Sequence, residues 1–248
     1  MSEAGRGGII VTGASKGIGA AIARELAGRG FVVAGLSRAG TVPDTPAGAP
    51  DGELIGITCD ITDERALTEA VTSFADRVAG RLAGLVNNAG VNLEAPSAQL
   101  PLETLRRSLE LNVVAAFHAS QLVYPYLRGR AGLIVHIGSF YDRLGVRGNL
   151  AYSATKAAQA SMTRTLAVEW ARDGIAVVNI APGYVLTDLN REFFSNAKNL
   201  AAVERRIPLG RLTEAEEVAR VVGMLFDAEA SALTGTTIYM DGAQGISL

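Results

Sequence analysis

The chain has 248 residues, of which 48% are hydrophobic, so it can bury one sizeable core and is neither disordered nor collagen-like. Its 23 basic and 25 acidic side chains leave a net charge of −2 without a block of like charge, which argues against nucleic acid or a membrane surface as a partner. A single cysteine, Cys59, excludes an intrachain disulfide, and with only two histidines the chain is a poor candidate for a dedicated zinc site.

Seven short runs rich in Val, Ile and Leu alternate with longer segments of helical periodicity, as parallel βαβ units require. This alternation predicts an α/β fold with one doubly wound, seven-stranded parallel sheet and helices on both faces. Residues 1–248 then form a single domain. The predicted strands are GIIVT from Gly8, FVVAGL from Phe31, ELIGIT from Glu53, LAGLVN from Leu82, GLIVHIG from Gly132, IAVVNIA from Ile175 and TTIYM from Thr236.

Apolar residues at helical spacing predict helices between these strands. Thr213, followed by Glu216 three residues later, is expected to form a capping box at the start of the last helix. Residues 40–52 contain three prolines and no helical period, so we expect a surface loop there and not a full crossover helix. The apolar faces are formed by Ile18, Ile22 and Leu26, by Leu67, Ala70, Val71, Phe74 and Val78, and by Val218, Val221, Val222 and Leu225.

The first strand runs directly into a glycine-rich turn, residues 12–19 (TGASKGIG), and then into a helix. Gly13 permits a tight turn, Gly17 lets a ligand approach the backbone, and Gly19 lets the helix pack closely on the strand. The N–H groups and dipole at a helix N-terminus favour negative charge. Together these features predict a site for the pyrophosphate of a dinucleotide.

The residues after the second strand bear on the choice of dinucleotide. An NAD-specific site would carry an acidic side chain there to hold the ribose hydroxyls, but this sequence has Leu36, Ser37 and Arg38. Arg38 can pair with a 2′-phosphate, and Lys16 in the glycine turn adds a second cation. We therefore expect NADP(H) to be favoured over NAD(H).

Tyr152 and Lys156 lie four residues apart in a predicted helix and so share one of its faces. A tyrosine has a reference pKa of about 10, and a nearby ammonium favours the phenolate and should lower that pKa. Ser139 closes the preceding strand, at the edge of the sheet where ligands of open α/β folds bind, and its hydroxyl can hydrogen-bond a carbonyl group. These three residues predict acid/base chemistry on a carbonyl or alcohol.

The ordered motifs of the chain resemble those of the classical short-chain dehydrogenases/reductases over essentially all 248 residues. The resemblance implies a Rossmann domain and a catalytic tetrad of Asn112, Ser139, Tyr152 and Lys156. The motifs that carry it are TGASKGIG, Cys59-Asp60, Asn87 to Gly90 (NNAG), Leu111 to Val113 (LNV), Ile137 to Ser139 (IGS), YSATK from Tyr152, and Pro182-Gly183.

In that family the matching residues have distinct roles, which the resemblance transfers to this chain. Tyr152 would be the general acid/base, and Lys156 would lower its pKa and bind the nicotinamide ribose. Ser139 would orient the carbonyl, and Asn112 would hold a water in a proton relay from Lys156 towards solvent. With the glycine turn, the resemblance predicts a cofactor site formed by Gly13, Ser15, Lys16, Gly17, Ile18, Gly19, Arg38, Asp60, Ile61, Asn88, Ala89, Gly90, Tyr152, Lys156, Pro182, Gly183 and Thr187.

The substrate is expected to contact a loop segment at about residues 183–212, which in this family folds over the active site. Apolar side chains in this segment predict a partly apolar ketone, while a sugar-acid or polyol dehydrogenase remains the alternative. The predicted substrate-contacting residues are Ser139, Tyr141, Tyr184, Leu189, Phe193 and Phe194, with Phe140 and Val91 as further apolar lining.

Three other functions fit the sequence less well. A non-catalytic dinucleotide sensor would be expected to lack Tyr152 or Lys156, and an enoyl reductase is disfavoured by their spacing. A sugar-nucleotide epimerase is disfavoured by the chain length and by the form of the glycine turn. His136 and His118 are expected to be structural, not catalytic.

The resemblance also implies a homotetramer, because the helices carrying Asn112 and Tyr152 match those that pair across a two-fold axis in the family. We expect a cytoplasmic protein, since no apolar run approaches the ~20 residues that span a bilayer and the N-terminal apolar stretch is too short for a signal peptide.

Overall fold

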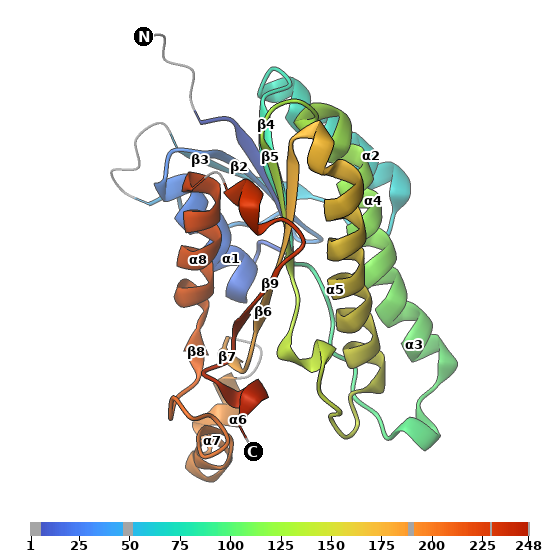
Figure 1. The fold of residues 1–248 in the computed structure, drawn as a ribbon, viewed down its shortest axis with the longest axis vertical. Helices are drawn as coiled ribbons and strands as arrows, with labels where there is room; N and C mark the ends of the chain where they lie inside the picture. The colour runs from blue at the N-terminus through green and yellow to red at the C-terminus, as the bar shows by residue number, and fades with distance from the viewer. Residues whose placement is uncertain (1–5, 47–51, 188–190, 229, 248) are drawn as a thin grey trace.

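The computed structural model describes residues 6–46, 52–187, 191–228 and 230–247. Seven parallel strands form one sheet in the order β3-β2-β1-β4-β5-β6-β9, which confirms the predicted doubly wound architecture (Figure 1). The strands are β1 (Gly8–Thr12), β2 (Val32–Ser37), β3 (Glu53–Thr58), β4 (Leu82–Asn87), β5 (Gly132–Ile137), β6 (Ile175–Pro182) and β9 (Thr237–Met240).

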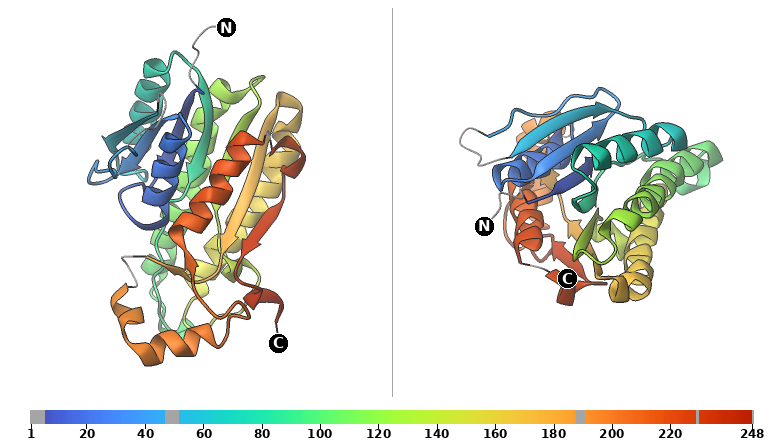
Figure 2. Two further views of the ribbon diagram at one scale, coloured as in Figure 1. Left: turned by 90° about the vertical axis from the view of Figure 1, so that its left-hand side faces the viewer. Right: turned by 90° about the horizontal axis from the view of Figure 1, so that it is seen from above.

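Helices cover both faces of the sheet, as Figures 1 and 2 show. The helices α1 (Gly17–Gly28) and α8 (Ala215–Asp227) bury one face, and α2 (Glu64–Arg77), α4 (Ala115–Leu127) and α5 (Leu150–Trp170) bury the other. Each face has its own apolar core, because successive strand residues point to opposite sides. Among the described residues, no helix is long and apolar enough to cross a membrane.

The helix starts follow local chemistry. Asp63 caps α2 by accepting hydrogen bonds from the backbone N–H groups of Arg65 and Ala66, both at 3.0 Å. The capping box of α8 was predicted one residue too early. The N-cap is Glu214, whose N–H donates to Glu217 Oε2 at 2.9 Å. Thr213 and Glu214 both pair with the strand Val185–Leu186, so the helix begins only at Ala215.

A feature that the sequence did not predict interrupts the helix between α3 (Leu102–Leu109) and α4. Residues Glu110–Val114 form one π-helical turn, η2, which contains Asn112. Such turns often occur at functional sites, because the extra residue turns a side chain or carbonyl away from the regular helix. Here the turn faces α5 and the end of β4.

The connection between β2 and β3 is a loop in the part that the structure describes, residues 38–46, as expected from its prolines. Within it, Val42 packs against the apolar core of the α1 face. The rest of this connection, residues 47–51, lies outside the described residues.

The segment after β6 forms a small layer of its own at the carboxyl end of the sheet (Figure 2). It contains the two-residue strand β7 (Val185–Leu186), which pairs with β8 (Thr213–Glu214), and the short helices α6 (Arg191–Ser195) and α7 (Ala197–Glu204). Phe194, Ile207 and Leu212 form its buried cluster.

Candidate active site

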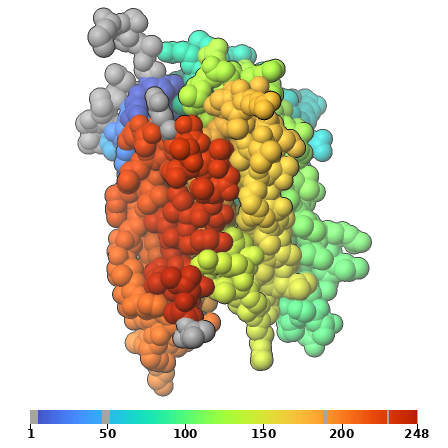
Figure 3. All heavy atoms as spheres, viewed as in Figure 1, coloured from blue at the N-terminus to red at the C-terminus, as the bar shows by residue number. Residues whose placement is uncertain are grey.

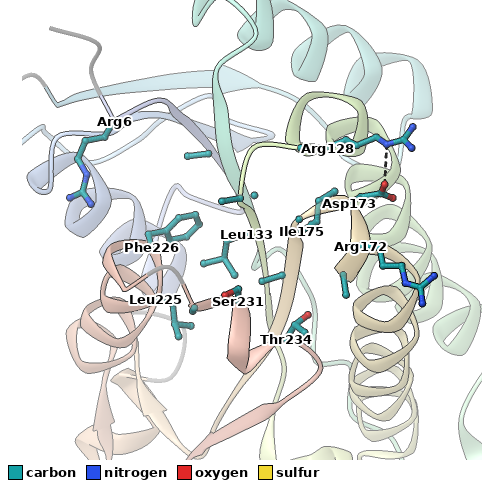
Figure 4. A pocket seen from close by; sticks show the side chains of 18 of the residues that line it. Arg6, Arg128, Leu133, Arg172, Asp173, Ile175, Leu225, Phe226, Ser231 and Thr234 are labelled. Atoms are coloured by element: carbon teal, nitrogen blue, oxygen red, sulfur yellow. Dashed lines mark hydrogen bonds and ion pairs between the residues drawn. The ribbon is translucent and has the colours of Figure 1, made fainter. Parts of the chain in front are cut away.

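The strand order reverses between β1 and β4, and the predicted site residues converge at the carboxyl ends of these strands and of β5 and β6. In open α/β sheets this crevice is the usual ligand site. A separate cavity of about 650 Å³ lies at the opposite, amino end, where Leu133 and Ile175 begin their strands (Figure 4). It contains none of the predicted site residues.

The glycine turn is shaped for close packing and for an anion. Gly13 and Gly17 have φ of +69° and +57°, in the left-handed region that glycine adopts without strain. A Cβ on Gly19 would lie 2.3 Å from the Gly13 oxygen, so no side chain fits there. Helix α1 begins at Gly17 with no side-chain cap from Lys16, which leaves its first N–H groups for a ligand.

The motif after β4 is hydrogen-bonded to this turn. Thr12 Oγ1 accepts from the N–H groups of Asn88 and Ala89, both at 3.0 Å, and Asn88 Nδ2 donates to the oxygens of Thr12 and Gly13. Thr187 lies on the far side of the turn, with Cγ2 3.5 Å from where a Cβ on Gly17 would be. The predicted cofactor residues of β1, β4 and β6 are therefore neighbours.

The end of β2 carries a buried hydroxyl without a partner in the described part of the chain, followed by an exposed guanidinium. Ser37 Oγ is buried without a hydrogen bond, while the neighbouring Arg38 is exposed. Asp60, the residue expected near the adenine, accepts two hydrogen bonds from Thr62, which together with the Arg38 charge lower the pKa of its carboxyl. The exposed guanidinium of Arg38 at this edge of the sheet can pair with a phosphate group.

Ser139 lies just beyond β5, and Tyr152 is in the first turn of α5. Ser139 is buried, with 6% of its surface exposed, and its Oγ accepts a hydrogen bond from Tyr141 N at 3.3 Å. The predicted lowering of the Tyr152 pKa is wrong for this structure. Burial raises the pKa of Tyr152 to about 12, although a hydrogen bond with Ser139 opposes the rise.

Lys156 is buried, and its side chain lies close to the Tyr152 ring. Its Nζ donates to Ile137 O at 2.7 Å and to Gln159 Oε1 at 2.9 Å, and it lies 5.4 Å from the centre of the Tyr152 ring. Burial lowers the pKa of Lys156 to about 7. The same desolvation therefore favours the neutral form of both Tyr152 and Lys156.

Asn112 has no exposed surface, and its side chain is fully engaged. Its Oδ1 accepts from Val91 N at 2.9 Å, and its Nδ2 donates to Val91 O and to Thr155 Oγ1, both at 3.0 Å. The backbone oxygen of Asn112 accepts a hydrogen bond from Gln159 Nε2 at 2.7 Å. Asn112 therefore fixes the loop after β4, and its predicted relay function stays a prediction.

Aromatic rings form one wall next to Tyr152. Tyr141 lies edge-on to Tyr152, with ring centres 5.8 Å apart, and its hydroxyl is 3.1 Å from that of Tyr184. Phe140 packs against both Tyr141 and Tyr184. Three of the predicted lining residues are thus brought together beside Tyr152, the predicted acid/base.

The rest of the predicted substrate set is buried behind this wall or is undescribed. Phe194 is buried in the cluster with Ile207 and Leu212, and Tyr184 packs against this cluster. Leu189 lies outside the described residues, and only the backbone of Phe193 is described. His136 is buried in β5 as expected, and His118 is half-buried in α4.

The sequence reasoning missed Thr12, Thr155 and Gln159, which hold the site residues in place. A signal for Gln159 was available, because Lys156, Gln159 and Thr163 recur at helical spacing and place polar groups on one buried face of α5. Nothing in the spacing indicates which backbone atoms those groups reach.

Comparison with known proteins gives the family. A family model described as Enoyl-(Acyl carrier protein) reductase matches residues 13–244. A chloroplastic tropinone reductase homologue of Arabidopsis thaliana is 34% identical over 245 residues, covering 96% of this chain and 75% of the relative. A 3β-hydroxysteroid dehydrogenase of Eggerthella lenta is 31% identical over 239 residues, covering 94% and 92% of the two chains.

Solved structures of similar fold belong to the same kind of protein as these relatives. A short-chain dehydrogenase/reductase from Serratia marcescens superimposes with a TM-score of 0.87 at 32% identity, over 96% of this chain and 98% of that one. A protein from Agrobacterium tumefaciens, assigned as a 2-deoxy-D-gluconate 3-dehydrogenase and solved with bound NADP, gives 0.84 at 31% identity, over 97% and 96%. The chain therefore belongs to the classical short-chain dehydrogenase/reductase family and is an NAD(P)(H)-dependent oxidoreductase acting between CH–OH and C=O.

Proposed function

We propose that this enzyme transfers a hydride between NADP(H) and a ketone or secondary alcohol, with reduction of a partly apolar ketone as its main activity. The nicotinamide of the bound cofactor supplies or accepts the hydride. The observation that carries the proposal is the position of Ser139, Tyr152 and Lys156 at the carboxyl edge of the sheet, beside the uncapped start of α1.

The proton chemistry follows from these side chains. The Ser139 hydroxyl donates a hydrogen bond to the substrate carbonyl and orients it. Tyr152 donates its proton to the carbonyl oxygen during reduction and accepts one from the alcohol during oxidation. The phenol, whose pKa burial raises, holds its proton at neutral pH and can give it to the carbonyl oxygen. Lys156 binds the nicotinamide ribose and stabilises the phenolate left after proton transfer.

The preference for NADP(H) rests on the end of β2. Arg38 would pair with the 2′-phosphate, the buried Ser37 hydroxyl would donate to it, and Lys16 would add positive charge from the glycine turn. The Agrobacterium relative solved with NADP supports the same choice.

The ketone preference rests on the aromatic wall of Phe140, Tyr141 and Tyr184 next to Tyr152. This wall offers a large apolar surface with two hydroxyls, which suits a cyclic or medium-chain ketone. The names of the relatives also include tropinone and a hydroxysteroid. A sugar-acid or polyol dehydrogenase is the second candidate, because the Agrobacterium neighbour is assigned to a gluconate.

A substrate panel with both cofactors tests the proposal. The purified enzyme is assayed with NADPH and NADH against cyclic ketones, medium-chain ketones, polyhydroxy ketones and a 2-enoyl thioester. We expect the highest kcat/KM with NADPH and a cyclic or medium-chain ketone. Turnover confined to polyhydroxy substrates supports the second candidate, and turnover confined to the thioester contradicts both. Cofactor binding without any turnover indicates a sensor.

We further propose a cytoplasmic homotetramer. Apolar side chains remain exposed on the α3–α5 face and on the C-terminal segments, which lie side by side with α5 in Figure 3. Light scattering should give four times the 25.8 kDa chain mass, and a monomer mass would reject the assembly. Cell fractionation tests the location. The exposed residues are Leu102, Leu109, Val114, Phe117, Leu150, Val168, Met224, Leu233 and Ile246.

A further inference from the structure

A fully buried glutamine connects Lys156 to the π-helical turn η2. Gln159 lies in α5, three residues after Lys156, and has no exposed surface. Its Oε1 accepts from Lys156 Nζ at 2.9 Å, and its Nε2 donates to the backbone oxygen of Asn112 at 2.7 Å. One side-chain amide therefore spans the distance between the ammonium and the turn that carries Asn112.

The chemistry of the two neighbours permits only one orientation of this amide. An ammonium only donates hydrogen bonds and a carbonyl oxygen only accepts them, so Oε1 must face Lys156 and Nε2 must face Asn112. A second acceptor of the ammonium is Ile137 O, at 2.7 Å on β5. Lys156 is thus held from two elements, by β5 directly and by η2 through Gln159.

We propose that Gln159 is a positioning residue, which holds the Lys156 ammonium in register with Tyr152 and couples it to the π-helical turn. This inference rests on the proposed function, because it concerns the lysine of the proposed site. An amide fixes a charge but does not readily pass a proton on, since it would have to become an imidic acid. Gln159 therefore acts on the orientation and charge of Lys156 and not as a proton carrier.

Few titratable groups other than Tyr152 lie around Lys156, so few could disturb a measurement of activity against pH. Tyr152 faces it from α5 and His136 from β5, whereas η2 and the loop after β4 present Asn112 and Gly90, which do not titrate. The Thr163 hydroxyl donates to Gln159 O at 2.9 Å, so His136 Nδ1, 2.8 Å away, must be the donor to Thr163. Burial and the Lys156 charge lower the His136 pKa to about 3, so this ring stays neutral.

The test uses Gln159→Met, which keeps the length of the side chain but removes both hydrogen bonds. The Lys156 ammonium then loses an acceptor, so the pKa of Lys156 falls. The Tyr152 phenolate is then less stabilised, so the pKa of Tyr152 rises. We expect kcat to fall about tenfold, the size of one hydrogen bond to a charged group. The rising limb of the pH profile for alcohol oxidation should move upward by about one unit.

Thr163→Val is the matched control, because Thr163 is equally buried in α5 and belongs to the same network without touching Lys156. This variant should lower the Tm and leave the rising limb of the pH profile for alcohol oxidation at the same pH. If Gln159→Met also leaves the limb in place, Gln159 merely packs the helix and the proposal is wrong.

Gln159→Glu keeps the test decisive if the methionine variant does not fold. A carboxylate in contact with Lys156 cancels its positive charge, so the limb should again move upward, and an unmoved limb overturns the proposal. Failure of the proposed function itself would appear separately, as catalysis that survives Tyr152→Phe in a chain with Gln159 intact.

Discussion

The surroundings of Lys156 and the segment at residues 183–212 meet at the same edge of the sheet but are built differently. Around Lys156, long elements supply buried polar groups, and Asn112, Gln159 and Lys156 are joined by hydrogen bonds of 2.7–3.0 Å. The later segment has the short helices α6 and α7 and a buried cluster of three residues, Phe194, Ile207 and Leu212.

This difference separates chemistry from selectivity. Tyr152 and Lys156, the proposed acid/base pair, are fixed by the sheet and by α5, so changes there should affect every substrate alike. The later segment packs largely on itself, so changes there should alter the ranking of substrates while the enzyme stays folded. The first and third predictions below perturb one side each, and the other two perturb the end of β2 and the start of α8.

The largest effect is expected from Tyr152→Phe, which removes the transferable proton and keeps the ring. The rate should fall at least ~10²- to 10⁴-fold for all substrates, with NADPH affinity nearly unchanged. Lys156→Ala should reduce both the rate and the affinity, because one ammonium serves both. Near-normal turnover in the phenylalanine variant would show that Tyr152 is not the acid/base.

The next effect concerns the cofactor. Arg38→Ala should reduce the ratio of kcat/KM for NADPH to that for NADH by about ten- to a hundredfold, since a charge-assisted hydrogen bond to a phosphate is lost. Arg106→Ala, an exposed arginine on α3, is the control and should leave the ratio unchanged. An unaltered ratio in the Arg38 variant would mean that this guanidinium is an ordinary surface charge.

A smaller effect is expected from Phe194→Leu in the cluster of the later segment. Loosening this cluster should change the ratio of kcat/KM for cyclic over polyhydroxy ketones several-fold, up to about tenfold. Hydrogen exchange in residues 191–207 should become faster, and it should slow on binding cofactor and ketone. Phe74→Leu, in the main core, should lower the Tm without altering the ratio. If Phe74→Leu changes the ratio and Phe194→Leu does not, the main core and not the later segment determines substrate selectivity.

The smallest effect is expected on thermal stability at acidic pH. It concerns Glu217 in the first turn of α8, which follows this segment in the chain. Hydrogen bonds from Arg211 and from the Glu214 N–H lower the pKa of Glu217 from 4.5 to about 2. The stabilisation is therefore complete above pH 4.5 and is lost as the pH falls towards 2. The Tm difference between the wild type and Glu217→Gln should shrink over this range. A constant difference would show that the carboxylate does not matter.

Much of the fold could be predicted because apolar periodicity sets it locally. All seven predicted strands are present, and the glycines of the turn at residues 12–19 have the expected backbone geometry. The capping box was misplaced by one residue, because the pairing of Thr213 with Val185 is a long-range contact that no local pattern records.

The convergence of Asn112, Ser139, Tyr152 and Lys156 at one edge of the sheet could also be predicted, but not their electrostatics. Spacing places Tyr152 and Lys156 on one helix face, yet their pKa values depend on burial by strands and loops that are distant in sequence. The π-helical turn and the Gln159 bridge likewise depend on tertiary contacts between η2 and α5. Helical spacing shows that a polar group is on the buried face, but not which atom it meets.

The central claim is that Tyr152 and Lys156 serve carbonyl reduction, and one measurement tests it most directly. The best ketone of the panel and its α,β-unsaturated analogue are incubated with NADPH deuterated at the transferable position, and the products are analysed by NMR. We predict that deuterium appears on the carbinol carbon of both products, with the C=C bond of the analogue intact. Deuterium on the β-carbon of a saturated ketone would contradict the account, because it would make the enzyme a reductase of C=C bonds.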